Sequence, residues 1–346
     1  MQNIFQKKIF LSQHFVLCLN LFFFFILWLF YPYVAGGRNL SNIASNLWPL
    51  LVLVIGQMFV LIVGGIDLSQ TSIMALVSVL GASIMSTQVD PVLFQKSPIW
   101  GLLLSADGGV LGGSPVSVPA GIAVMLLVGI IIGCINGVSV ARFKMPPFIV
   151  TLVSMMFFSG LAIFLTASEN LTHLPESFIA IGKSGIGFIS YSFIIVAVLA
   201  LVAHVILRNT VLGRWFYAVG MNIKTSIISG VPTQRVILLA YMFSGCCAAI
   251  GSILYSARLE GGRPTLGQDL LLDIIGAAVI GGISLFGGKG KVIWAVYGAL
   301  FFVVLANALN MMNLSFFTIN IVKGCVILLA ALLDVMRVRL TKQEAG

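Results

Sequence analysis

The chain has 346 residues, of which 60% are hydrophobic and only 8% are charged, and its mean hydropathy is +1.12. A soluble domain has roughly a quarter of its residues charged, so this composition excludes an ordinary water-soluble protein. The bilayer core requires about 20 apolar residues for each spanning helix, and the sequence supplies many such stretches. We therefore expect an all-α integral membrane protein with a single transmembrane domain over residues 1–346.

The 19 Lys and Arg exceed the 10 Asp and Glu, an excess that is also found in proteins that bind nucleic acids. In membrane proteins the same excess arises because cytoplasmic loops are enriched in Lys and Arg. The apolar composition favours this second explanation, so we expect membrane lipid and no nucleic acid as a partner. The five Cys and three His show no metal-ligand spacing, so we expect no metal or cofactor in this chain.

About ten segments are long and apolar enough to span a membrane. The first follows Lys7 and Lys8 and is longer than the apolar core of a cleaved signal peptide. The eighth is short, which fits a broken or partly re-entrant helix. The expected spans are 10–31, 44–63, 71–88, 118–141, 147–167, 187–207, 235–257, 270–286, 292–311 and 316–336.

Ten spans with a cytoplasmic amino terminus place thirteen Lys and Arg on the cytoplasmic side and five on the other side. This is the bias expected of a multi-pass protein of the bacterial inner membrane, so we expect both termini in the cytoplasm. Two halves of five spans would allow the inverted repeats found in other transporters. The segments 64–68 and 281–285 look alike, but both fall on the cytoplasmic side and do not support such a repeat.

Small residues repeat every four positions in two of the expected spans. Gly129, Gly133 and Gly137 form a double GxxxG pattern, and Ser244, Ala248 and Ser252 form a similar stripe. Stripes of this kind allow two helix backbones to approach closely in lipid. They indicate tight packing either within one subunit or between two subunits.

The longest cytoplasmic connection, residues 208–235, contains signals for a short helix. Asn222 is a typical N-cap residue, and Gly230 is typical of the position after a helix end. Val219, Ile223 and Ile227 form an apolar stripe, while Lys224 and Ser226 lie elsewhere around the helix. A short amphipathic helix needs a groove, which could belong to its own protein, to the lipid surface or to a partner.

Five stretches of the chain, in the right order, resemble the ribose-type sugar permeases of ATP-binding-cassette importers. These stretches are GGIDLS (64–69), INGVSVARFKMPPFIVTL (135–152), LGRWFYAVGMN (212–222), LDIIGAAVIGGISLFGGKG (272–290) and IVKGCVILLAALLD (321–334). Related branches of the same superfamily carry branched-chain amino acids or nucleosides. The resemblance extends over nearly the whole chain.

The resemblance implies a second permease subunit, identical or not, a cytoplasmic ATPase that binds ATP and Mg, and an extracytoplasmic sugar-binding protein. This chain would then be a non-catalytic subunit that translocates a monosaccharide such as a ribose-like pentose. In such importers a short cytoplasmic helix docks on the ATPase, and the matching segment here is 220–230. The residues expected to couple the two subunits are Val219, Gly220, Asn222, Ile223, Lys224, Ser226, Ile227 and Gly230.

Two further segments qualify the resemblance. The extracytoplasmic loop 86–118 is longer than the family pattern, and either shapes the docking of the binding protein or is an inert insertion. The segment GISLFGGKGK (282–291) superficially looks like a phosphate-binding P-loop, but Gly290, and not Ser or Thr, follows Lys289. We therefore expect no ATP hydrolysis by this chain.

Polar residues within the expected spans are candidates for a sugar pathway, although such groups also join helices by hydrogen bonds. They are Asn46, Gln57, Asn136, Thr151, Asn307 and Asn310. Asp273 and Lys323 either form an ion pair, or Lys323 extends to the interface. Asp67, at the cytoplasmic mouth of the second span, either gates the pathway or caps a turn.

Three other classes of function are less consistent with the sequence. An ion-coupled secondary transporter typically needs deep intramembrane acidic residues, which are nearly absent here. A channel would need a filter-like repeat or a charged ring, and an enzyme would need a cluster of catalytic groups. The need for an ATPase partner distinguishes the importer from the secondary transporter.

Overall fold

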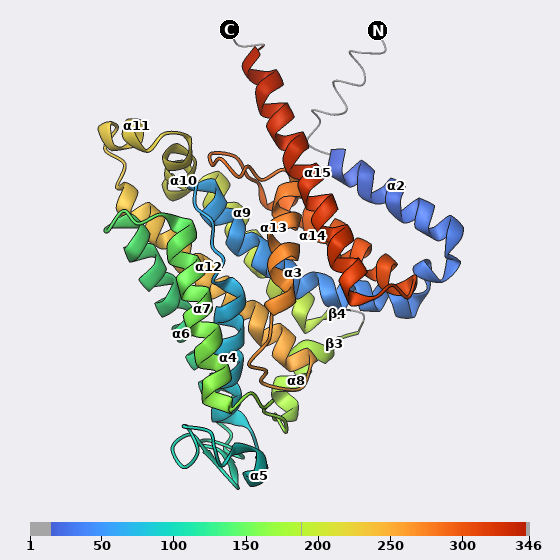
Figure 1. Cartoon of the computed structure of the whole chain (residues 1–346), viewed down its shortest axis with the longest axis vertical. Helices are drawn as coiled ribbons and strands as arrows, with labels where there is room; N and C mark the ends of the chain where they lie inside the picture. Colours follow the sequence, from blue (N-terminus) through green and yellow to red (C-terminus); the bar gives the residue numbers. More distant parts are fainter. Residues whose placement is uncertain (1–14, 188, 344–346) are drawn as a thin grey trace.

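The computed structural model of the chain describes residues 15–187 and 189–343, which are mostly helical (Figure 1). The long helices are α2 (Phe15–Phe30), α3 (Gly37–Ile62), α4 (Gln70–Met85), α6 (Ser117–Ala141), α7 (Pro147–Thr166), α9 (Tyr191–Asn209), α12 (Thr233–Arg258), α13 (Leu271–Gly281), α14 (Val292–Met311) and α15 (Phe316–Gln343). The shorter helices are α5 (Pro91–Phe94), α8 (Glu176–Lys183), α10 (Val211–Met221) and α11 (Ile223–Ile228), with 3-10 turns at Pro32–Ala35 and Gln268–Leu270. Two small antiparallel hairpins pair β1 (Leu104–Ser105) with β2 (Gly108–Gly109) and β3 (Gly185–Ile186) with β4 (Ile189–Ser190).

A helix overlaps with each of the ten segments expected to span, which confirms the all-helical membrane class. Among the described residues, six helices are long and apolar enough to cross a membrane: α3, α6, α7, α9, α12 and α14. The apolar parts of α2, α4 and α15 are shorter, and α13 has only 11 residues. Residues 10–14 of the first expected span lie outside the described residues. The count of ten spans therefore stays a prediction.

The helices pack around a buried centre, and their connections lie at two opposite ends of the molecule (Figure 1). α11 and the C-terminal end of α15 lie at one end of the molecule, and the loop that carries α5 lies at the other (Figure 1). α3 is buried along most of its length and packs with α4 and α6 around α12. α6, α7 and α9 have less than a third of their apolar stretches buried, as expected for helices that also contact lipid or another subunit.

The glycine stripe of α6 packs against α12 within the same subunit. A Cβ atom on Gly129 would lie 2.6 Å from the backbone oxygen of Gly245, and one on Gly133 would overlap with the backbone oxygen of Tyr241. Only glycine allows the two backbones to come this close. The stripe therefore joins two helices of one chain.

The long loop after α4 folds into a compact cap. Its hairpin returns to the end of α4, where the Gly109 N–H donates to the Ser86 oxygen (2.8 Å) and the Leu111 N–H donates to the Ile84 oxygen (3.1 Å). Phe94 and Leu104 are buried beneath it. The loop is thus a built structure, and its role in docking a binding protein stays a prediction.

We expect Gly133→Ala to destabilise the protein, because the added methyl group would force α6 away from α12. Overpacking of this kind typically costs about 1–3 kcal/mol. Gly160→Ala on the exposed side of α7 is the matched control, since nothing lies within 4 Å of its Cβ position. Thermal unfolding of the purified variants in detergent measures the difference. Equal unfolding temperatures for the two variants would contradict the packing described.

Candidate functional site

The connection between α3 and α4, residues 63–69, is a break in the helical structure that forms hydrogen bonds with α6, α7 and α12. α3 ends before Gly64, whose positive φ of 82° lets its N–H donate to the Leu61 oxygen (2.9 Å). The chain then runs back along α3, so that the Gln70 amide at the start of α4 donates to the Leu53 oxygen (3.2 Å). Non-helical backbone at membrane depth requires partners inside the protein.

Asp67 lies in this α3–α4 break and is buried, with 1% of its surface exposed. One carboxylate oxygen accepts hydrogen bonds from the backbone N–H and the hydroxyl of Ser69 (3.0 and 2.6 Å). The other accepts from the hydroxyl of Ser244 on α12 (2.6 Å). Among the described residues no Lys or Arg forms an ion pair with Asp67. Asp67 therefore stabilises a turn, and it lies inside the protein rather than at an open mouth.

Three of the six residues predicted to line a pathway surround the same break: Gln57, Asn136 and Thr151. In the orientation in which both polar atoms of its amide have partners, Gln57 donates to the backbone oxygen of Asp67 (3.0 Å) and accepts from the Asp67 N–H (3.3 Å). Asn136 donates to the Ser69 hydroxyl (2.8 Å), and Thr151 donates to the Ile66 oxygen (3.3 Å). All three hold the break in place, and Gln57 and Asn136 are buried.

The other three, Asn46, Asn307 and Asn310, line one cavity of about 220 Å³, together with Asn42, Tyr255 and Asp273. This outer cavity lies between α3, α12, α13 and α14. Amide groups both donate and accept hydrogen bonds, so they can bind the hydroxyl groups of a solute. Pockets for drug-sized ligands measure roughly 300–1,000 Å³, so this smaller cavity suits a small polar molecule.

Arg258, which the sequence analysis missed, orders the rim of the outer cavity. Pro49 inside α3 has no N–H to donate to the oxygen of Ser45, four residues earlier. The Arg258 guanidinium donates instead to this oxygen (3.1 Å) and to the side-chain oxygens of Asn46 (2.6 Å) and Asn42 (3.2 Å). A proline within an apolar helix was the sequence signal for a freed carbonyl.

Asp273 on α13 and Lys323 on α15 form a buried ion pair. The Lys323 Nζ lies 2.8 Å from both carboxylate oxygens, and the two residues are only 7% and 8% exposed. The structure thus favours the ion pair over extension of Lys323 to the interface. Because Asp273 also lines the outer cavity, the pair holds α15 beside it.

The predicted coupling segment forms two helices rather than one. α10 ends at Met221, and α11 begins after Asn222, whose side chain accepts a hydrogen bond from the Thr225 N–H (3.0 Å) as the predicted N-cap. Gly230 follows α11 with a positive φ of 78°. Val219 was wrongly placed in the stripe of the short helix, because it belongs to α10 and is buried.

Close backbone contacts bind α10 to the end of α3 and to the loop before α14. A Cβ atom on Gly220 would overlap with the oxygen of Ile62, which also accepts a hydrogen bond from the Gly288 N–H (2.9 Å). The Tyr217 hydroxyl donates to the Gly290 oxygen (2.7 Å). We call these five residues the coupling anchor, because they join α10, which leads into the predicted coupling segment, to the buried core.

The two apolar sides of α11 have different surroundings. Ile223 and Ile227 border an open cavity of about 500 Å³ together with the α6–α7 turn and α12, and 44% and 58% of their surfaces are exposed. Whether this side of α11 faces its own chain, lipid or a partner stays a prediction. On another side of α11 Ile228 is 87% exposed, and Met221, the last residue of α10, is 78% exposed. The sequence analysis missed these two residues, because a stripe of spacing four through Ile223 and Ile227 includes neither of them.

Lys224 and Ser226 differ in a similar way. Lys224 is exposed, whereas Ser226 is buried and its hydroxyl donates to the Asn222 oxygen (2.8 Å). Ser226 therefore stabilises α11 internally, and Lys224 adds a positive charge to the exposed surface near Ile228.

Residues 39–331 match the protein family described as "Branched-chain amino acid transport system / permease component". Ribose import permease proteins are similar over most of the chain. The one from Haemophilus influenzae is 32% identical over 86% of this chain and 84% of its own length, and the one from Bacillus subtilis is 33% identical over the same shares. The D-allose transport system permease protein of Escherichia coli is 28% identical over 87% of this chain and 85% of its own length. No solved structure matches the chain.

We expect Asp273→Asn to lower the stability of the protein, because it leaves Lys323 charged and buried without its partner. Removal of one member of a buried pair costs about 3–5 kcal/mol. The exchanged pair, Asp273→Lys with Lys323→Asp, should recover a large part of this loss. Thermal unfolding in detergent measures both variants. If the exchanged pair is no more stable than the single variant, the two residues do not depend on each other.

Proposed function

The chain belongs to the branched-chain amino acid transport system permease family, and we propose that it is the permease subunit of an ATP-driven importer for a monosaccharide such as a ribose-like pentose. The main support for a sugar as the solute is the similarity to ribose and D-allose permeases over more than four fifths of the chain. The outer cavity supports it, because its asparagine side chains suit hydroxyl groups.

The chemistry of the outer cavity favours a sugar over the alternative solutes of the family. A branched-chain amino acid carries a positive and a negative group, each of which needs a charged partner in a site of low dielectric. Asp273, the acidic residue of the cavity lining, is already paired with Lys323. A nucleoside is larger than a monosaccharide and fits the volume of about 220 Å³ less well.

We propose ten spans in the bacterial inner membrane with both termini in the cytoplasm. The common placement of α11 and the end of α15, opposite the α5 loop, supports this orientation (Figure 1). Two inverted halves of five spans are compatible with the count, but the similar segments 64–68 and 281–285 do not support them. A Cβ on Gly287 would lie 3.2 Å from the Gly64 Cα, so these regions meet at one end of the molecule.

The proposed assembly contains a cytoplasmic ATPase that binds ATP and Mg, a second permease subunit and an extracytoplasmic sugar-binding protein. The exposed residues Ile228, Met221 and Lys224 form the surface that would contact the ATPase. Motion of α11 would pass through the coupling anchor to α3, α13 and α14. These three helices extend from the anchor region to the outer cavity, so a shift at one end would change the other.

The test of ATPase docking is the double variant Met221→Asp, Ile228→Asp. Both side chains are exposed, so we expect the chain to fold while stimulation of the ATPase by loaded binding protein is lost in liposomes. The double variant Met221→Leu, Ile228→Leu keeps the surface apolar and should retain stimulation. Full stimulation by the aspartate variant would contradict docking at this surface. Solute transport by the chain without any ATPase would overturn the importer and favour an ion-coupled secondary transporter.

The test of the sugar pathway is Asn310→Leu, because among the described residues the Asn310 amide bonds only within its own helix, to the Ala306 oxygen (2.8 Å). We expect sugar uptake to fall roughly three- to tenfold, which corresponds to the loss of one hydrogen bond to the solute. Asn209→Leu at the exposed end of α9 is the control. Uptake of radiolabelled pentose into proteoliposomes measures both. Unchanged uptake would place the pathway elsewhere.

A further inference from the structure

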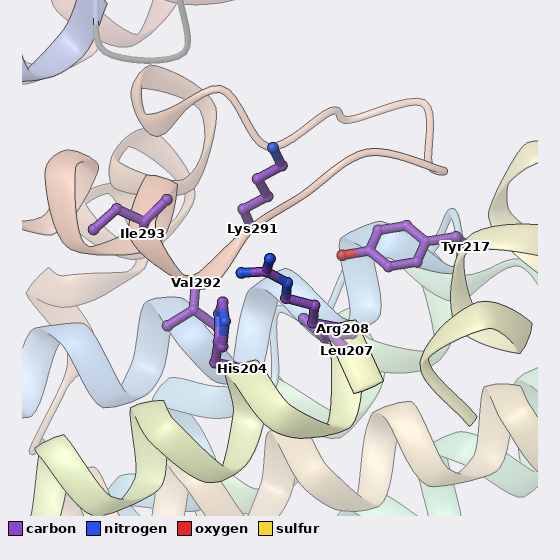
Figure 2. A pocket seen from close by; sticks show the side chains of 7 residues that line it. All are labelled: His204, Leu207, Arg208, Tyr217, Lys291, Val292 and Ile293. Carbon is purple, nitrogen blue, oxygen red and sulfur yellow. The ribbon is translucent and has the colours of Figure 1, made fainter. Parts of the chain in front are cut away.

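A second type of cavity lies between the end of α9, α10 and the start of α14, and its volume is about 490 Å³ (Figure 2). Its polar lining residues are His204, Arg208, Tyr217 and Lys291, and its apolar lining residues are Leu207, Val292 and Ile293. No lining residue is acidic. The cavity therefore combines positive charge with apolar walls, whereas the outer cavity is lined by amides.

The polar groups approach this cavity from different elements. His204 and Arg208 project from α9 toward the loop before α14, and the Tyr217 hydroxyl points toward Arg208 from α10 (Figure 2). Burial raises the pKa of Tyr217 above its usual value, so its hydroxyl remains protonated. Within the described chain, no carboxylate lies within ion-pair distance of Arg208. The Tyr217 proton is already donated to the Gly290 oxygen (2.7 Å), so the nitrogen groups of Arg208 and His204 are the donors that suit an anionic oxygen ligand, above all a phosphate group.

Such a phosphate group could belong to a lipid headgroup or to a soluble phosphate compound. The outer surface of α9 distinguishes between these two sources. Val198, Leu201 and Val205 are 57%, 63% and 41% exposed, and their spacing places them on the same side of the helix as Arg208. An acyl chain could lie along this apolar strip while its headgroup reaches the cavity. A soluble phosphate would use the positive groups and leave the strip without a role.

We propose that this cavity binds the phosphate group of an anionic phospholipid, with its acyl chains along α9. The proposed orientation places the site in the cytoplasmic leaflet, where anionic lipids attract Lys and Arg. Tyr217 belongs both to the cavity and to the coupling anchor. A bound lipid would therefore connect α9, α10 and α14 beside the anchor and stabilise the position of the coupling helices.

The test measures lipid retention by the purified chain, independently of transport. The chain is incubated in detergent with phosphatidylglycerol or phosphatidylcholine, and native mass spectrometry counts bound lipid. We expect a preference for phosphatidylglycerol that falls about fivefold or more in the double variant His204→Gln, Arg208→Gln, as the loss of one cationic contact predicts. The double variant Arg214→Gln, Arg235→Gln removes two exposed charges outside the cavity and should keep the preference.

Thermal unfolding of the unaltered chain gives a second measurement that needs no variant. Phosphatidylglycerol should raise its unfolding temperature more than phosphatidylcholine, and excess inorganic phosphate should not reproduce the effect. Equal retention of the two lipids, or equal losses in both double variants, would overturn the site. Stabilisation by inorganic phosphate alone would assign the cavity to a soluble phosphate and overturn the lipid. A second copy of the chain that covers the cavity and excludes lipid would overturn it as well.

Discussion

The structure depends on the need to satisfy backbone polar groups within the protein wherever helix is interrupted. In lipid no water is available to bind free N–H and C=O groups, so each break in a helix requires donors and acceptors from its neighbours. The α3–α4 break meets this need with Gln57, Thr151 and Tyr241 on its backbone. Ser244 and Ser69 then donate hydrogen bonds to the Asp67 carboxylate. The need to give every buried polar group a partner therefore explains why these polar residues lie in the core.

Glycine allows the neighbours to come close enough to do so. Gly129 and Gly133 let α6 pack closely on α12, and both helices bond to the break, α12 through Ser244 and α6 through Asn136. At the coupling anchor, Gly220 lies against the end of α3 with no room for a side chain. Glycine therefore supports both the buried core and the connection from this core to α10 and α11. Because of this close contact, we expect α10 and the end of α3 to move together.

The sequence predicted features that depend on local chemistry. Asn222 and Gly230 mark the ends of α11 because a side-chain cap and a positive φ act within a few residues. Asp273 and Lys323 were recognised because charge is rare in such spans, although only the structure joins them across 50 positions. The roles of Gln57 and Asn136 could not be predicted, since a polar residue in an apolar helix looks the same whether it lines a cavity or binds a turn. Their partners are set by long-range packing.

Pro49 gives α3 a particular part in any motion between the two ends. α3 begins at the outer cavity with Asn42 and Asn46, and ends at the coupling anchor with Ile62. The proline removes one backbone hydrogen bond between these points, and the Arg258 guanidinium replaces it from α12. Proline is one of the few positions at which a helix bends sharply, because one backbone hydrogen bond of the helix is missing there. A shift of α3 at the anchor would therefore concentrate at Pro49, next to the asparagines that line the outer cavity.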